Sequence, residues 1–254
     1  MEQETKAPLM KHFQELRWRL VRIALAVVIG VGLSLYFADD IINTLKSLTE
    51  GIELQSIDPT EVIGTYFNLA VICGFAFATP VILYEIVMFI RPALSPRERR
   101  NLFTLLPSMV IAFAIGVAFA YYVLLPPAID FLHDFGSNVA TPEWRISKYV
   151  TMITRLLFVI GLCFETPIIM YFLTRIGILT PQKLSRFRRW AVLLAFLIAA
   201  VATPTPDPIN QVIVAVPLYL LYEIGIILSR IAYRGKRKPS VAKPSERSYQ
   251  KSEK

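Results

Sequence analysis

The stretch that decides the fold is LVRIALAVVIGVGLSLYF, residues 20–37, in which eighteen residues carry a single charge, at Arg22. A run of this length and composition is typical of a helix that crosses a membrane. Comparable apolar segments follow at residues 66–90, 102–125, 149–174, 190–202 and 209–228. The chain of 254 residues is 55% hydrophobic and only 18% charged, more apolar than an ordinary soluble domain. The sequence therefore predicts an all-α, polytopic membrane protein with six transmembrane helices.

We expect one transmembrane domain over residues 1–230. Residues 231–254 form a basic tail, rich in Lys, Ser and Pro, whose composition is typical of disorder. A polar segment of nineteen residues precedes the first full-length span, which is not the pattern of a cleavable signal peptide. The first helix is therefore expected to be retained.

The Lys and Arg residues divide unequally between the two sides of the membrane. If alternate loops share a side, 22 of the 27 lie on the side of both termini, 3 lie on the other side and 2 lie within spans. Loops rich in these residues stay in the cytoplasm, so both termini are predicted to be cytoplasmic. The formal charge of +8 then serves orientation and contact with anionic membrane lipids, and it does not require a nucleic-acid partner.

The last two spans form a hairpin that is predicted to be short. Residues 190–228 must supply both helices and a turn, which leaves roughly 16 residues, or about 25 Å, for each helix against a hydrocarbon core of ~30 Å. Such a mismatch predicts a thinned or partner-contacting edge of the protein. An equally open alternative is that the first of the two helices extends back into residues 187–189.

Two loops on the side opposite the termini, residues 39–63 and 125–148, are long enough to contain helices. The sequence Asp58-Pro59-Thr60-Glu61 has the residues that favour a helix start, with Asp58 as the N-cap. We expect these loops to form an ordered cap.

Residues suited to catalysis or metal binding are sparse. Cys73 and Cys163 both lie in apolar segments, and the predicted topology separates His12 from His133. The sequence contains no glycine-rich phosphate loop, nucleophile elbow or metal-binding helix pattern. We therefore expect neither enzymatic activity nor a cofactor or metal site.

Acidic residues stand among basic ones at the cytoplasmic ends of the spans. Glu15 shares a helical face with Lys11 and Arg19, and pairing four residues apart on a helix surface is a sufficient explanation for its presence. Glu98 follows Ser95 in the pattern of a capping box. A carboxylate in either role keeps acceptor capacity for an incoming guanidinium group, so a binding role stays open.

Glu165 lies inside the fourth span, where an acid is costly and indicates a function or a specific partner. Arg155 is ten residues away, too far along one helix to pair with it directly. The alternative is a protonated or water-facing glutamate that holds helices together. Glu85 and Glu223 lie nearer the cytoplasmic ends of their spans and are expected to reach the interface.

Two polar residues flank the turn of the final hairpin. Asp207 is suited to cap the last helix. Gln211 lies in the first turn of that helix, where its amide can bond a neighbouring helix or face headgroup water.

Short motifs at the span ends resemble the TatC family of twin-arginine translocases over about residues 9–230. They are HFQELR at 12–17, PVILYE at 80–85, FIRPAL at 89–94 with ERR at 98–100, FETP at 164–167, PLY at 217–219 and EIG at 223–225. The resemblance implies a curved, glove-like six-helix bundle in the plasma (inner) membrane of a prokaryote. It implies a receptor that works on folded cargo proteins and uses the proton-motive force.

The resemblance also implies the site residues. Glu15 and Glu98 would receive the two arginines of a twin-arginine signal peptide, in a site that includes Arg17 and Phe89. Each guanidinium–carboxylate contact is worth about 1.5–3 kcal/mol, and lysine lacks the planar fork that makes it bidentate.

The implied partners are the single-span TatA and TatB subunits, along the last two helices, and further copies of the chain itself. Thr205, Asp207 and Gln211 would belong to the subunit contact. The turn is one residue longer than the family's usual pattern, which leaves Thr203 and Thr205 as alternatives. A proton-coupled solute transporter that uses Glu165 is the alternative function, but it needs an internal repeat that the sequence does not display.

Overall fold

The structure, a computed structural model, describes residues 3–49, 53–91, 96–135, 143–203 and 207–234, and for residues 3–13, 90 and 96–104 it describes the backbone only. In chain order, the elements in these ranges are α1 Gln3–Tyr36, α2 Ala38–Lys46, β1 Leu54–Gln55, α3 Pro59–Ile90, α4 Pro96–Phe119, a π-helical segment Ala120–Leu124, α5 Leu125–Asp134, β2 Trp144–Arg145, α6 Ile146–Cys163, α7 Thr166–Ile176, α8 Pro181–Arg186, α9 Arg188–Ala202 and α10 Pro208–Arg234. Most of the predicted tail, residues 235–254, lies outside this description.

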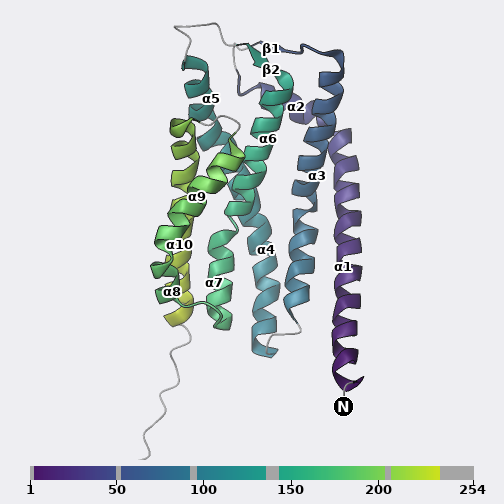
Figure 1. The fold of residues 1–254 in the computed structure, drawn as a ribbon, viewed down its shortest axis with the longest axis vertical. Helices are drawn as coiled ribbons and strands as arrows, with labels where there is room; N and C mark the ends of the chain where they lie inside the picture. The colour runs from purple at the N-terminus through teal and green to yellow at the C-terminus, as the bar shows by residue number, and fades with distance from the viewer. Residues whose placement is uncertain (1–2, 50–52, 92–95, 136–142, 204–206, 235–254) are drawn as a thin grey trace, which may run out of the picture.

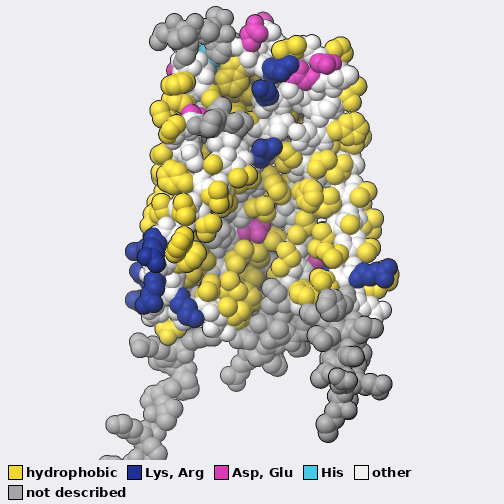
Figure 2. Space-filling model, viewed as in Figure 1, with side chains coloured by type: hydrophobic (Ala, Val, Ile, Leu, Met, Phe, Trp, Pro, Cys, Tyr) yellow, Lys and Arg dark blue, Asp and Glu magenta, His cyan; other side chains and the backbone are white. Residues whose placement is uncertain are grey.

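The helices form an elongated bundle whose long helices run roughly parallel to its long axis (Figure 1). We call the end where α1 begins and α10 finishes the terminal end, and the opposite end, with α2, β1 and β2, the loop end. Both ends of the described chain lie at the terminal end, as an even number of crossings requires (Figure 1). Hydrophobic side chains cover the middle of the molecule, and Lys and Arg side chains gather near the terminal end on the face shown in Figure 2.

Five helical segments of the described chain are long and apolar enough to cross a membrane: Gln14–Tyr36, Pro59–Phe89, Leu105–Asp134, Ile146–Ile176 and Pro208–Arg234. These segments confirm the all-α, polytopic membrane class. The remaining predicted span, residues 190–202, lies in α9, which has 15 residues and is about 22 Å long. This helix is shorter than a hydrocarbon core of ~30 Å.

The expectation that both helices of the final hairpin are short is wrong for the second. Helix α10 has 27 residues, about 40 Å. It continues past residue 228 because its end packs against α7, where the hydroxyls of Thr174 and Ser229 share a hydrogen bond of 2.7 Å. The apolar run marks only part of this helix, and tertiary contacts extend the helix beyond it.

The fourth predicted span, 149–174, is two helices rather than one. Helix α6 ends at Cys163, and α7 begins at Thr166. Pro167 has no backbone N–H to donate to the preceding turn, which breaks the hydrogen-bond ladder at this point. Glu165 occupies the N-cap position of α7, directly at the break.

The described parts of the two predicted loops form a cap at the loop end. Strands β1 and β2 pair in parallel, with Leu54 opposite Trp144. Asp58 is the N-cap of α3, as predicted, and accepts the backbone N–H of Thr60 at 2.9 Å. This bond lowers the pKa of the Asp58 carboxyl, with a smaller contribution from the positive charge of Arg145. The cap therefore ties the loop after α1 to the start of α6.

Helices α1 and α3 are antiparallel and make a close backbone contact at Gly30 and Gly74. A Cβ atom on Gly30 would lie 2.4 Å from the carbonyl oxygen of Gly74, and one on Gly74 would lie 2.8 Å from the backbone nitrogen of Val31. These distances leave no room for a side chain, because backbone atoms cannot rotate away. The two glycines thus fix how α1 lies on α3.

We predict that Gly30→Ala lowers the unfolding free energy of the protein by about 1–3 kcal/mol, as overpacking does, because the new methyl group meets the backbone of α3. Thermal unfolding of the detergent-solubilised chain measures the effect. Gly32→Ala is the matched control in the same helix, since nothing lies within 4 Å of its added Cβ atom. The control should leave stability unchanged or raise it by up to about 1 kcal/mol through helix propensity. Equal effects of the two substitutions would contradict the tight contact.

Candidate functional site

A cluster of charged side chains joins α1 to α3 near the terminal end. The Arg19 guanidinium donates from Nη2 to Glu15 Oε1 at 2.5 Å and from Nη1 to Glu85 Oε2 at 2.8 Å. It also donates to the backbone carbonyl of Met88 at 3.2 Å. Arg22 lies 3.3 Å from the second oxygen of Glu85. We call Glu15, Arg19, Arg22 and Glu85 the α1–α3 ion cluster.

Burial differs sharply across the α1–α3 ion cluster. The Glu85 side chain is 4% exposed and that of Arg19 is 15% exposed, whereas Glu15 is 42% exposed. A buried carboxylate is stable only when it is paired and hydrogen-bonded, and Glu85 has two guanidinium groups for this purpose. The buried Arg19–Glu85 pair therefore anchors the cluster. Glu15 presents its carboxylate at the exposed edge of the cluster, which we call the rim.

The expectation that Glu85 and Glu223 simply reach the interface is thus wrong for Glu85, which is buried in an ion pair. Glu223, 26% exposed, pairs with Arg188 at 2.8 Å and accepts a hydrogen bond from Tyr219. The signal that was available in the sequence is the placement of Arg22 inside the first apolar run together with Glu85 inside the second. A charged residue inside a span is costly unless an opposite charge lies beside it, so an arginine and a glutamate in two neighbouring spans indicate an ion pair.

The residues predicted for a peptide site come from three helices that meet at the terminal end. Arg17 is exposed on α1, two residues after Glu15, and Phe89 is partly buried at the end of α3. The backbone of Glu98 lies in the first turn of α4, at the same end of the bundle (Figure 1). Its side chain is outside the described residues.

Glu165 lies apart from this group, in the interior at the break between α6 and α7. Its side chain is buried, with 3% of the residue exposed, and Oε1 has no hydrogen-bond partner among the described residues. Neighbouring glycines allow this close packing, since a Cβ atom on Gly116 would lie 2.8 Å from Phe164. The acid is enclosed by packed helices, and as expected it is not paired with Arg155.

The polar residues of the final hairpin are bonded within the chain. Asp207 accepts the backbone N–H of Asn210 at 2.7 Å, which confirms the predicted cap. The Gln211 amide donates to the carbonyl of Phe196 in α9 at 3.0 Å. Thr203 is buried and bonds the carbonyl of Ala199 at 2.9 Å. Thr205 lies outside the described residues.

Helix α9 is two-sided. Small residues at a spacing of three or four are buried against the rest of the bundle: Ala191, Ala195, Ala199 and Ala202. Large apolar residues point outward instead, and those exposed by 36% or more are Trp190, Val192, Leu193, Leu194, Phe196, Leu197, Ile198 and Val201. The helix therefore lies close to its neighbours and offers an apolar outer face.

We predict that Glu85→Gln lowers the unfolding free energy by on the order of 2–3 kcal/mol, because it removes the buried one of the two carboxylates that pair with the mostly buried Arg19. Thermal unfolding in detergent measures this loss. Glu223→Gln is the control, and it should cost less than about 1 kcal/mol because its partner Arg188 is 44% exposed. A larger loss for the control than for Glu85→Gln would show that the α1–α3 ion cluster does not anchor the two helices.

Comparison with known proteins identifies close relatives. The family model described as "Sec-independent protein translocase protein (TatC)" matches residues 11–217. The TatC protein of Aquifex aeolicus is 38% identical over 237 residues, which covers 91% of this chain and 98% of the relative. The TatC protein of Escherichia coli is 34% identical and covers 93% of each chain.

The solved structures agree with the sequence matches. A crystal structure described as "Twin Arginine Translocase Receptor- TatC" superposes with a TM-score of 0.79 at 37% identity, over 87% of this chain and 99% of the other. A second, "Twin Arginine Translocase Receptor- TatC in DDM", superposes with the same score at 38% identity. The chain is therefore a membrane protein that belongs to the TatC family of Sec-independent protein translocases.

Proposed function

We propose that this chain is the receptor subunit of a twin-arginine translocase, and that it binds the paired arginines of signal peptides through Glu15 and Glu98. The observation that carries the proposal is the rim carboxylate of Glu15, 42% exposed and held by a guanidinium group at 2.5 Å. Two related crystal structures are those of a twin-arginine translocase receptor. The secondary-transporter alternative receives no support from these relatives.

The chemistry of the rim supports selective binding of arginine. The Arg19 guanidinium already donates a hydrogen bond to the Glu15 carboxylate. A carboxylate has about four lone-pair sites, so it can still accept hydrogen bonds from a second guanidinium group. Glu98, at the start of α4, would bind the other arginine of the peptide. Arg17 raises the local positive charge, which disfavours basic peptides that lack the matching geometry. Phe89 would supply apolar contact to the residues beside the arginine pair.

The fixed position of Glu15 matters for discrimination between arginine and lysine. A bidentate guanidinium contact needs a carboxylate of defined orientation, whereas an ammonium group is a point charge that tolerates many orientations. Arg19, anchored by Glu85, restrains the Glu15 carboxylate in this way. The buried pair would thus act on peptide selectivity without touching the peptide.

The apolar outer face of α9 supports a contact with single-span partner subunits, which the family resemblance names as TatA and TatB. Asp207 and Gln211 would shape that surface by capping α10 and by joining it to α9, and Thr205 would add a polar group at the turn. Further copies of the chain would complete the receptor complex. We place the protein in the plasma membrane of a prokaryote, with both termini cytoplasmic, as a non-enzymatic subunit that depends on the proton-motive force.

A twin-arginine peptide with a photo-crosslinker should bind the detergent-solubilised chain, and Glu15→Gln or Glu98→Gln should weaken binding by roughly tenfold each, the value of one charged hydrogen bond. Fluorescence anisotropy of the labelled peptide measures affinity, and crosslinking locates it. Glu53→Gln is the matched control, because Glu53 is an exposed acid at the loop end. Glu165→Gln should also leave affinity unchanged, since that acid is buried away from the rim.

A Lys-Lys peptide should bind the same protein at least tenfold more weakly than the Arg-Arg peptide. Equal affinity for the two peptides, or a loss in Glu53→Gln that matches the loss in Glu15→Gln, would overturn the proposed site.

A further inference from the structure

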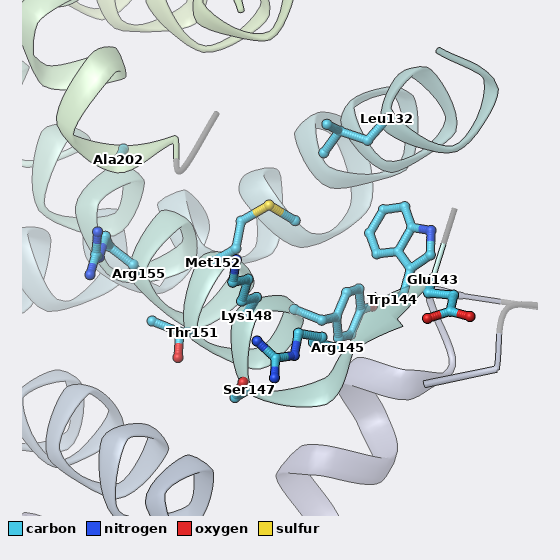
Figure 3. A pocket seen from close by; sticks show the side chains of 11 residues that line it. Leu132, Glu143, Trp144, Arg145, Ser147, Lys148, Thr151, Met152, Arg155 and Ala202 are labelled. Carbon is cyan, nitrogen blue, oxygen red and sulfur yellow. The ribbon is translucent and has the colours of Figure 1, made fainter. Parts of the chain in front are cut away.

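A cavity of about 660 Å³ lies at the loop end, among α5, α6 and the last residue of α9. Figure 3 shows its lining, which is basic along α6 and apolar where α5 and α9 approach. We call it the α6 cavity. Among the described residues, none of those assigned to signal-peptide binding or to subunit contact lines it.

In the described part of the chain, three cations line the α6 cavity: Arg145, Lys148 and Arg155. Lys148 and Arg155, seven residues apart, lie along one face of α6, and Arg145 is the N-cap residue directly before this helix. One acid, Glu143, also lines the cavity, but it lies at the opposite edge from Arg155 (Figure 3). Positive charge therefore dominates the wall formed by α6.

These cations have few partners inside the chain. Among the described residues, no carboxylate makes an ion pair with Lys148 or Arg155. The Nε atom of Arg145 is buried and has no hydrogen-bond partner in the described chain, and the same holds for the indole nitrogen of Trp144 beside it. The α6 cavity thus contains donors and positive charges that an anionic ligand would satisfy.

The depth of Arg155 indicates where such a ligand comes from. Arg155 is nine residues from the start of α6, about 14 Å along the helix, and it is exposed within the segment Ile146–Ile176 that is long enough to cross a membrane. An arginine exposed to hydrocarbon is costly and needs a polar partner at its own depth.

The short helix α9 supplies the matching geometry. It spans about 22 Å, and its last residue, Ala202, lines the same cavity as Arg155. In Figure 1 the upper ends of α9 and α10 lie well below β1 and β2. Lipid beside so short a helix thins, which draws its headgroups toward the level of Arg155.

We propose that the α6 cavity binds the phosphate group of an anionic phospholipid from the leaflet at the loop end. The phosphate would bond Arg145, Lys148 and Arg155, which suit a phosphate because charge-assisted hydrogen bonds to it are strong. The glycerol and the first acyl carbons would pack on Leu132, Met152 and Ala202. The bound lipid would hold the thinned membrane edge beside α9, and its location in that leaflet rests on the orientation given under Proposed function.

Native mass spectrometry of the detergent-solubilised full chain, titrated with phosphatidylglycerol, tests the proposal. The double variant Lys148→Gln with Arg155→Gln should bind at least about tenfold more weakly, because it loses one or two charged contacts. Lys46→Gln is the matched control, since it removes an exposed cation at the same end outside the cavity. Arg155→Lys keeps the charge and should retain most of the binding, which separates loss of charge from loss of folding.

A competition experiment distinguishes a lipid from a free phosphate. Inorganic phosphate at a concentration equal to that of the lipid should not displace phosphatidylglycerol, because it makes no apolar contact with the cavity. Displacement at equal concentration would overturn the lipid assignment, and unchanged lipid affinity in the double variant would overturn the site. Binding of the twin-arginine peptide should be the same in all these variants, so failure here is distinguishable from failure of the proposed receptor function.

Discussion

The close contact of α1 with α3 is the constraint on which the candidate site depends. Arg19 lies eleven residues before Gly30, and Glu85 lies eleven residues after Gly74. Eleven residues make just over three turns, about 16 Å, so each charged side chain faces nearly the same way as its glycine. Because the helices are antiparallel, both charges arrive at the same level. The glycine contact therefore brings the pair into register.

This register determines how charge is distributed where the helices leave the membrane. A low-dielectric interior strengthens every electrostatic contact and penalises every unpaired charge. Glu85 and Arg19 satisfy each other there, and Arg22 adds a second cation from the next helical turn. Glu15 shares Arg19 but stays at the rim. One buried pair thus allows a neighbouring carboxylate to be both ordered and accessible, which are the two requirements of a selective receptor.

The sequence predicts the class of the fold well because its signals are local. The apolar runs, the unequal distribution of basic residues and the helix caps at Asp58 and Asp207 all act within a few residues, and the structure bears out the membrane class and both caps. The end of α10 and the burial of Glu85 depend on contacts between distant segments, and these were not predicted. The spacing that pairs Arg19 with Glu85 becomes meaningful only once Gly30 and Gly74 are known to touch.

The candidate site was predicted mainly through family resemblance, since the pattern around Glu15 alone fits an ordinary helix-surface pairing. The structure contains that pairing, with Arg19, and adds the buried partner that the pattern could not reveal. A simple four-residue spacing on one helix gives no information about a third residue on another helix. Glu165 is recognised by the cost of an acid in a span, but the packed helices that enclose it depend on contacts between distant segments, such as that of Gly116 with Phe164.

The two-sided character of α9 has a consequence for how this chain can evolve. On the inner side, Ala195 and Ala199 are 4% and 0% exposed, so a larger residue at either position would push the helix away from the bundle. On the outer side, positions such as Leu193 and Leu197 need only remain apolar. Selection should therefore hold the inner alanines nearly constant while the outer surface drifts, and that surface is free to adapt to a changed neighbour without rebuilding the interior.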